Sequence, residues 1–402
     1  MIPVADAIQI VLDRTTSLPD ESVALVDALG RILAEDIVAD SDLPPFDRAQ
    51  MDGYAIRAAD VANTPARLRI VGESAAGAGW QHAMKAGEAV RIMTGAPVPA
   101  GADAVQQVEL TREVDDGGFV EISEAVKSGR SIVKQAAEIK MGETVLRAGE
   151  EIHAAMIATL ASFGHAQVKV GRRPRVAVMA TGSELVDVDQ TPGRDQIRDS
   201  NNYTIAAYAS LAGATVERLP LVSDDTEELK RQIAKAAAAS DMLITSGGVS
   251  MGVYDFTKAA LKELGAEIFF ERVALRPGKP TVFARIGNAL VFGLPGNPVS
   301  VAVTFNLFAR TALRVMQSAK QATLPTDTAV LARDLKGSKD RESYLPAILR
   351  TNEKGTLLVE PLKWGGSSDF VAFARTTALI NVPSGVGRIE ADSPVKVLRL
   401  PS

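Results

Sequence analysis

The sequence predicts a multi-domain protein in which an α/β domain is combined with smaller β-rich parts. Three observations lead to this class. Short apolar segments near residues 175, 241 and 289 each end in a glycine turn and lead toward a helix, which is typical of an open parallel or mixed sheet. Short alternating runs among glycine and proline turns precede and follow that region. The chain has 402 residues, enough for about two to four domains with separate cores.

The first part of the chain is expected to form a linker domain of helical and extended segments. Residues 3–14 have one apolar face with a helical period, which predicts an amphipathic helix. The prolines within residues 43–47 exclude a helix there and indicate an extended connector. Helical periodicity returns at 152–163, so we expect a discontinuous domain made of residues 1–47 and 139–172.

Two β-rich parts are predicted on either side of the α/β domain. Residues 48–138 contain alternating runs such as 67–71 and 119–122, and they are expected to form a domain inserted into the linker domain. Residues 324–402 contain further short apolar segments and are expected to form a small β-barrel. Its predicted strands are 328–331, 357–361, 378–382 and 395–400.

Residues 173–323 are expected to form the α/β domain. Its predicted strands are 175–180, 241–245 and 289–292. An acid at Asp225 with a glutamate three residues later is typical of a helix start. Further helices are expected at 256–264 and after Pro298.

Composition excludes several kinds of site. The sequence has no cysteine, so disulfides, thiolate zinc sites and a cysteine nucleophile are excluded, and its three histidines are scattered. A bound metal is therefore expected to be a hard ion with oxygen ligands, such as magnesium. A net charge of −5 and 5% aromatic residues argue against a nucleic-acid or membrane-surface partner. The N-terminal sequence shows no signal peptide or membrane span, which favours a cytoplasmic protein.

The glycine turns that follow the predicted strands are candidate ligand-binding loops. Ligands bind at the carboxyl ends of parallel strands, and glycine lets the backbone approach them closely. Amide groups and helix N-termini favour anions, so a phosphate-bearing ligand is expected. The sequence has no P-loop signature and no dinucleotide signature after a strand. The candidate turns are residues 181–184, 246–250 and 293–298.

Charged residues beside these turns are candidates for metal and oxyanion binding. Carboxylates near a phosphate site can hold magnesium, and the candidates are Glu184, Asp224, Asp225 and Asp255. Arginine and lysine in a proline-stiffened loop can bind an oxyanion, which singles out Arg276 and Lys279. Read singly, each of these residues is equally compatible with a helix cap or a solvated surface position.

An ordered set of motifs resembles the molybdopterin molybdenumtransferase family, of the MoeA and gephyrin E-domain type. The motifs cover about three-quarters of the chain in the family's order. They are Leu43-Pro-Pro-Phe-Asp47, Met51-Asp-Gly-Tyr-Ala55, Ile92-Met-Thr-Gly-Ala96, Thr181-Gly-Ser-Glu-Leu185, Asp199-Ser-Asn201, Ser246-Gly-Gly-Val-Ser-Met-Gly252, Arg276-Pro-Gly-Lys-Pro280 and Gly293-Leu-Pro-Gly-Asn-Pro-Val-Ser300.

The resemblance implies an elongated subunit that works as a homodimer and binds molybdopterin through its α/β domain. The implied reaction converts adenylylated molybdopterin and molybdate into molybdenum cofactor and AMP, with magnesium and with a molybdopterin adenylyltransferase as a possible partner. Its implied catalytic residues are Asp52, Thr94, Glu138, Glu184 and Asp255. Its implied molybdate ligands are Lys134, Arg276 and Lys279. Its implied substrate-binding residues are Thr181, Gly182, Ser183, Ser246, Gly247, Gly248, Ser250, Pro295, Gly296, Asn297 and Pro298.

The sequence departs from the family pattern after the inserted domain. An Arg-Arg-x-Gly-Glu-Asp type of segment corresponds here to residues 133–138, in which Ala136 and Ala137 replace the glycine and an acid. Two other functions therefore stay open. One is a magnesium-dependent phosphohydrolase that acts on a pterin or nucleotide, and the other is a non-catalytic molybdopterin-binding scaffold. The choice between molybdenum and tungsten also stays open.

Overall fold

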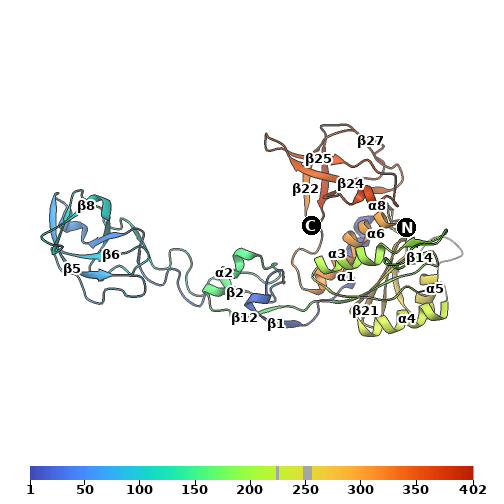
Figure 1. The fold of residues 1–402 in the computed structure, drawn as a ribbon, viewed down its shortest axis with the longest axis horizontal. Helices are drawn as coiled ribbons and strands as arrows, with labels where there is room; N and C mark the ends of the chain where they lie inside the picture. The colour runs from blue at the N-terminus through green and yellow to red at the C-terminus, as the bar shows by residue number, and fades with distance from the viewer. Residues whose placement is uncertain (223–225, 248–255, 402) are drawn as a thin grey trace. The chain divides into compact units, whose positions relative to one another are not determined.

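The structure is a computed structural model that describes residues 1–222, 226–247 and 256–401 (Figure 1). The chain divides into two compact units. The larger consists of Met1–Glu35, Ala148–Ile157 and Ala166–Ser402, and the smaller of Asp36–Arg147 and Ala158–His165. Each unit has hydrophobic clusters of its own, and each is described by itself. The boundaries of the four expected domains stay predictions.

The larger unit is built around a mixed sheet with the expected parallel centre. The strand order is β16-β13-β17-β21-β20-β18, in which the first four strands are parallel and β20 is antiparallel to both of its neighbours. The three strands predicted in this region are β13, β17 and β21. The bounds are β16 (Thr215–Arg218), β13 (Arg175–Ala180), β17 (Met242–Ser246), β21 (Ala289–Leu294), β20 (Val282–Ile286) and β18 (Glu267–Phe270).

Helices cover both faces of this sheet (Figure 1). On one face, side chains of α4 (Thr226–Ala239) and α5 (Phe256–Glu263) pack with strand residues such as Met179 and Val291. The other face carries α1 (Val4–Arg14), α3 (Asn201–Leu211) and one long helix formed by α6 (Pro298–Thr304), a π-helical turn (Phe305–Ala309) and α7 (Arg310–Met316).

Two of these helices bury apolar side chains in the core of the larger unit. The predicted helix at 3–14 is α1, and its buried Val4, Ala7 and Val11 join the core of the α/β sheet. The helix from Pro298 to Met316 is long and apolar enough to cross a membrane, yet 89% of it is buried inside the protein. It is therefore a core helix of this unit. The expected helix cap at Asp225 lies outside the described residues.

The segments around the inserted part pair with each other in the larger unit. β1 (Asp20–Ala24) runs antiparallel to β12 (Gln167–Gly171). The helix predicted at 152–163 is α2 (Ala154–Ser162), whose residues up to Ile157 belong to the larger unit and the rest to the smaller. Close to the strand ends, β14 (Leu185–Val186) and β15 (Ile197–Arg198) form a short parallel pair, and the one-turn helix α8 (Phe370–Phe373) belongs to the C-terminal part.

The C-terminal part is the expected β-barrel. The order β24-β25-β22-β28-β26 closes on itself because β26 also pairs with β24. The bounds are β22 (Thr326–Leu331), β24 (Glu342–Thr351), β25 (Leu357–Pro361), β26 (Ala378–Val382) and β28 (Pro394–Arg399). The sequence did not predict β24, whose apolar pattern is interrupted by Pro346. A further short pair joins β23 (Leu335–Lys336) to β27 (Arg388–Ile389).

The smaller unit contains the expected β-rich part. Its sheet has the order β7-β4-β6-β5-β9-β8, with β5 and β6 parallel and the other pairs antiparallel. The bounds are β4 (Gly53–Ile56), β5 (Ala66–Ser74), β6 (Glu88–Ile92), β7 (Ala104–Gln107), β8 (Thr111–Val114) and β9 (Phe119–Ile122). Two short pairs join β3 (Arg48–Ala49) to β10 (Ile132–Val133) and β2 (Ile37–Val38) to β11 (Thr144–Leu146).

Candidate functional site

The three strand-end turns of the α/β sheet lie together. The amide of Thr181 donates to the carbonyl of Ser246 at 3.0 Å, and the amide of Gly247 donates to the carbonyl of Leu294 at 3.3 Å. Gly247 has φ of +90°, and a Cβ at this position would lie 2.4 Å from the Thr181 carbonyl oxygen. Only glycine meets both requirements. Because the amides of Thr181 and Gly247 already have protein partners, an anion would have to use other groups of these turns.

Asn201 connects two of the turns through its side chain. Its Nδ2 donates to Ser246 Oγ at 2.8 Å and to the Gly296 carbonyl at 2.7 Å. Asn201 is the first residue of α3, so the helix start places it between the ends of β17 and β21. The motif Asp199-Ser200-Asn201 contributed to the family resemblance, but sequence reasoning did not single out Asn201 as a site residue.

A cavity of about 900 Å³, here called the strand-end cavity, opens at these turns. Seven predicted site residues line it: Thr181, Glu184, Ser246, Gly247, Gly296, Asn297 and Pro298. Side chains of the β14–β15 segment, of α3 and of the C-terminal part complete the wall, among them Val188, Ile197, Tyr203 and Phe370. Gly182 belongs to the same turn, where a Cβ would meet the Glu184 side chain at 2.5 Å. Ser183 lies beside it in this turn.

The magnesium hypothesis rests mainly on residues that the structure does not describe. Asp224, Asp225 and Asp255, and the substrate-binding candidates Gly248 and Ser250, lie outside the described residues. Glu184 is the candidate carboxylate that lines the cavity. Among residues 1–222, 226–247 and 256–401, no group of three or more acidic or histidine side chains is arranged to hold a metal ion. Of the four candidate carboxylates, Glu184 is thus the one that lies among the described residues.

Asp199 is a buried carboxyl group in the wall of the strand-end cavity. Its exposed fraction is 3%, and burial raises its pKa, although the amide of Asn202 donates to Oδ1 at 3.1 Å and lowers it. The pKa of Asp187, in the neighbouring loop, is shifted in the opposite direction. The pKa of its carboxyl is lowered by hydrogen bonds from the amide of Val188 and the hydroxyl of Tyr203. Sequence reasoning selected neither carboxylate.

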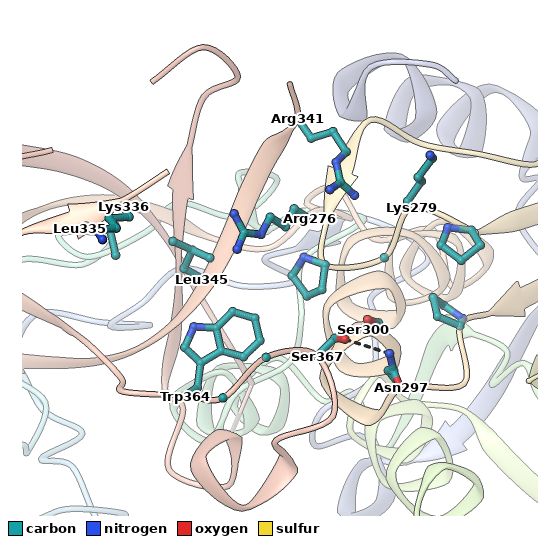
Figure 2. A pocket seen from close by; sticks show the side chains of 16 residues that line it. Arg276, Lys279, Asn297, Ser300, Leu335, Lys336, Arg341, Leu345, Trp364 and Ser367 are labelled. Atoms are coloured by element: carbon teal, nitrogen blue, oxygen red, sulfur yellow. Dashed lines mark hydrogen bonds between the residues drawn. The ribbon is translucent and has the colours of Figure 1, made fainter. Parts of the chain in front are cut away.

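A second cavity of about 670 Å³ lies where the α/β domain meets the barrel (Figure 2). Four cationic side chains line it: Arg276, Lys279, Lys336 and Arg341. We call it the cationic cavity. Asn297 lines both cavities, so they adjoin at the N-terminal end of α6. The wall of the cationic cavity also includes Pro295 and the loop at residues 276–280, which the sequence predicted as part of the site.

Backbone pairing places Arg276 beside the barrel. β19 (Leu275–Arg276) runs parallel to the start of β24, with Arg276 opposite Ser343. The next turn needs a glycine, because Gly278 has φ of +115° and a Cβ would lie 2.4 Å from Thr304 Cγ2. A loop of the C-terminal part is held to the start of α6 by a hydrogen bond, in which Asn297 Nδ2 donates to Ser367 Oγ at 2.9 Å (Figure 2).

Two more predicted site residues, Asp52 and Thr94, meet in the smaller unit. The amide and hydroxyl of Thr94 both donate to Asp52 Oδ1, at 2.6 and 2.8 Å. These bonds stabilise the charged carboxylate, first through the amide, and lower the pKa of Asp52.

In the same unit, Lys134 and Glu138 form hydrogen bonds with the start of β3, at Asp47 and Arg48. Lys134 Nζ donates to Asp47 Oδ2 at 2.7 Å, and Glu138 accepts from Arg48 at 3.0 Å. The hydrogen bond from Lys134 lowers the pKa of Asp47. Between them, Ala136 has φ of +61°, in the left-handed region. Lys134 and Glu138 are thus engaged in contacts within their unit.

Sequence reasoning also missed the barrel residues of the cationic cavity. Lys336, Arg341 and Trp364 are far from the glycine turns in the sequence, and Arg341 precedes the strand that was not predicted. The available signal was the charged run Lys336–Arg341, which by itself indicates only a solvated surface.

The fold and the turns define a multi-domain α/β protein with a ligand-binding type of cavity at the strand ends of its sheet. Family models match the chain in three parts: "MoeA N-terminal region (domain I and II)" at residues 2–164, "Probable molybdopterin binding domain" at 177–315 and "MoeA C-terminal region (domain IV)" at 328–400. The chain belongs to the MoeA family of molybdenum cofactor biosynthesis, as the sequence motifs predicted.

Curated relatives are similar over nearly the whole chain. The molybdopterin molybdenumtransferase of Bacillus subtilis (strain 168) is 36% identical, over 99% of this chain and 94% of the relative. That of Haemophilus influenzae is 35% identical, over 94% and 93%. A crystal structure of the molybdopterin biosynthesis MoeA protein from Pyrococcus horikoshii has a TM-score of 0.83 and 32% identity, with 99% of both chains covered.

Proposed function

We propose that this protein inserts molybdenum from molybdate into adenylylated molybdopterin and releases AMP, with magnesium. The observation that carries the proposal is the pair of adjoining cavities in the larger unit. One is formed by three strand-end turns and the other by four cationic side chains. Relatives named molybdopterin molybdenumtransferase, similar over nearly the full chain, support this reaction.

The strand-end cavity suits the pterin nucleotide. Its volume of about 900 Å³ is within the range of cavities that hold organic ligands. Val188, Ile197 and Phe370 provide apolar surface, while the turns provide polar backbone. Asn297 precedes the long helix that starts at Pro298, and a helix N-terminus favours a phosphate group. The substrate-binding roles of the turn residues belong to this proposal.

The cationic cavity suits molybdate, which is a dianion. Arg276 and Lys279 come from the same short loop, and Ser300 on α6 adds a hydroxyl group. Charge-assisted hydrogen bonds from arginine and lysine stabilise oxyanions. We therefore assign molybdate capture to Arg276 and Lys279. Lys134, the third candidate, belongs to the smaller unit, and its role stays part of the family-based proposal together with those of Asp52, Thr94 and Glu138.

Cleavage of a phosphoanhydride requires alignment and charge neutralisation more than a protein nucleophile. Magnesium would neutralise phosphate charge, and Glu184 would be one of its ligands, with Asp224, Asp225 and Asp255 as further candidates. The chain itself holds the nucleotide between the turns and keeps the cationic side chains beside it. The proposal includes a homodimer, a cytoplasmic location and supply of the substrate by a molybdopterin adenylyltransferase.

A test of this function replaces Glu184 by glutamine. Glu184→Gln keeps the shape of the side chain and removes its charge, so we expect cofactor formation to fall by about 100-fold or more, by analogy with the loss of one electrostatic contact in an active site. Glu217→Gln, on exposed β16, is the matched control and should keep wild-type activity. Wild-type turnover by Glu184→Gln would contradict the assignment of Glu184.

The other two functions are separated by the molybdate requirement. A molybdenum-inserting transferase should form cofactor and release AMP when pterin nucleotide and molybdate are both present. Release of AMP at the same rate without molybdate, with no cofactor formed, would indicate a phosphohydrolase. Tight binding of the pterin nucleotide with no turnover under either condition would indicate a scaffold.

A further inference from the structure

We propose that residues 365–372 of the C-terminal part are a lid over both cavities and that Ser367 is the latch that holds this lid to the start of α6. In the latched state the lid caps the helix, and in the open state Asn297 takes over that cap. The part of the inference that concerns ligand passage rests on the proposed function, because it takes the pterin nucleotide as the ligand.

The lid contributes to the wall of both cavities. Gly365, Gly366 and Ser367 line the cationic cavity, and Ser368 and Phe370 line the strand-end cavity. One short segment thus borders both ligand spaces, so its displacement would open both of them to solvent.

The lid is a body of its own between two fixed points of the chain. The carboxylate of Asp369 accepts from the amide of Gly365 at 2.8 Å and from the amide of Ala372 at 3.0 Å, which ties the two ends of the lid together. Immediately before and after it, Trp364 and Phe373 pack against the core of the larger unit. The lid can therefore move as one piece while its neighbours in the chain stay in place.

Ser367 joins the lid to α6 by two hydrogen bonds. Its carbonyl accepts from the amide of Val299 at 3.0 Å, and its Oγ accepts from Asn297 Nδ2 at 2.9 Å (Figure 2). Val299 is the second residue of the helix that starts at Pro298, and an amide at this position has no acceptor within its own helix. The carbonyl of the lid therefore supplies a cap for the helix.

Asn297 gives the same helix a second way to be capped. It occupies the N-cap position, where the side-chain oxygen of an asparagine can accept from an amide of the first turn. Among the described residues, however, no side chain caps the start of α6, because Asn297 is engaged with Ser367. When the lid leaves, rotation of the Asn297 side chain can replace the lost cap. This exchange of partners lowers the free energy of opening and makes the helix start a two-state element.

A ligand in the strand-end cavity would favour the latched state. Phe370 lines this cavity with 54% of its surface exposed, and Val188 and Ile197 of the same cavity are also exposed. An organic ligand would cover this apolar surface of the lid, and a ligand shifts a two-state equilibrium toward the state that it binds better. The lid is therefore expected to admit the ligand when open and to retain it when latched.

The amide of Val299 reports opening of the lid directly. Val299 is fully buried, so exchange of its amide hydrogen with solvent requires loss of the bond to Ser367. The amide of Val301, which donates to the Asn297 carbonyl at 3.0 Å within the first turn, is the matched control for fraying of the helix. Hydrogen exchange of the full chain, followed by NMR, should show that Val299 exchanges about tenfold faster than Val301 or more.

Replacement of the latch residue should change this exchange rate. Ser367→Ala removes the Oγ acceptor and keeps the carbonyl. Loss of one neutral hydrogen bond shifts the opening equilibrium by about two- to tenfold, so the exchange of Val299 should accelerate by this factor while that of Val301 stays the same. Ser368→Ala, at the neighbouring serine of the same lid, is the matched control and should leave the exchange of Val299 unchanged.

Ser367 also lines the cationic cavity, so its role as a latch must be separated from a ligand contact. Removal of a contact raises mainly the dissociation rate of a ligand, whereas removal of a latch raises both the association and the dissociation rate. Stopped-flow fluorescence of Trp364 in a Trp80→Phe background measures both rates with adenylylated molybdopterin, since the chain has two tryptophans. We expect both rates to rise in Ser367→Ala by about the same factor as the exchange of Val299.

Three outcomes would overturn the inference. They are exchange of Val299 no faster than that of Val301 in the wild type, exchange of Val299 unaffected by Ser367→Ala, and an unchanged association rate in that variant. The first two are measured without ligand, so failure of the pterin nucleotide to bind would contradict the proposed function while exchange still decides the lid. Conversely, accelerated exchange of Val299 in Ser367→Ala, in a protein with no molybdate-dependent turnover, would support the lid and contradict the proposed function.

Discussion

Ala136 is a single residue whose backbone conflicts with its side chain. Its φ of +61° is in the left-handed region, which costs a residue with a Cβ about 1–2 kcal/mol. The resemblance to the family implies glycine at this position. We expect Ala136→Gly to raise the stability of the smaller unit by about 0.5–1 kcal/mol, because the relief of strain exceeds the entropy that glycine adds to the unfolded chain. Denaturant unfolding measures this.

The neighbouring Ala137 provides the matched control for this prediction. It is not among the described residues with positive φ, so glycine there relieves no strain. Ala137→Gly is expected to leave stability unchanged or lower it. Equal effects of the two substitutions would show that the left-handed backbone at Ala136 carries no cost.

The hydrogen bonds to Asp52 predict a pH effect. Its pKa is lowered in the folded state, so its contribution to stability is present above the ordinary aspartate pKa and is lost as the pH falls through the lowered value. Thr94→Val removes the hydroxyl donor and keeps the amide. We expect the pKa of Asp52 to rise part of the way toward its ordinary value, as measured by carboxyl NMR. An unchanged titration of Asp52 would contradict the hydrogen-bond explanation.

At the scale of elements, the helix start of α3 holds two strand-end turns in register. Asn201 donates to Ser246 Oγ and to the Gly296 carbonyl, which joins the end of β17 to the turn after β21. Replacement by leucine removes both bonds, each of which contributes about 0.5–1.5 kcal/mol. We therefore expect Asn201→Leu to lower stability by about 1–3 kcal/mol and to weaken binding of the pterin nucleotide, as measured by calorimetry.

Asn288 offers a control at the opposite end of the same sheet. It lies exposed in the turn between β20 and β21, away from the strand-end cavity. Asn288→Leu should leave pterin-nucleotide binding unchanged. Equal losses in the two variants would mean that the effect of Asn201 is not local to the turns.

At the scale of the whole molecule, two units with separate cores are expected to unfold in separable steps. Ile56 and Ile244 are both fully buried, the first in the smaller unit and the second in the larger. Truncation of such a side chain to alanine costs about 2–5 kcal/mol. We expect Ile56→Ala to shift the transition reported by Trp80, and Ile244→Ala the one reported by Trp364. A common shift of both transitions by either variant would show a single cooperative unit.

Local patterns in the sequence were sufficient to predict many elements. The periodicity of residues 3–14 predicted α1, and the apolar runs before the glycine turns predicted β13, β17 and β21. Strand β24 was not predicted, because Pro346 and its charged ends hide an apolar pattern that depends on pairing with β25 and β26. The start of α3 was likewise not recognised as part of a site.

The sequence by itself determined the family, the apolar strands and the glycine turns, because turn geometry and hydrophobic period are properties of neighbouring residues. Only the tertiary structure decided which distant side chains share a cavity. Arg276 and Arg341 line the same cavity because β19 pairs with β24, and Asn201 meets Gly296 because parallel strands end at one edge of the sheet. Such contacts depend on strand order and on closure of the barrel, which no local pattern of residues encodes.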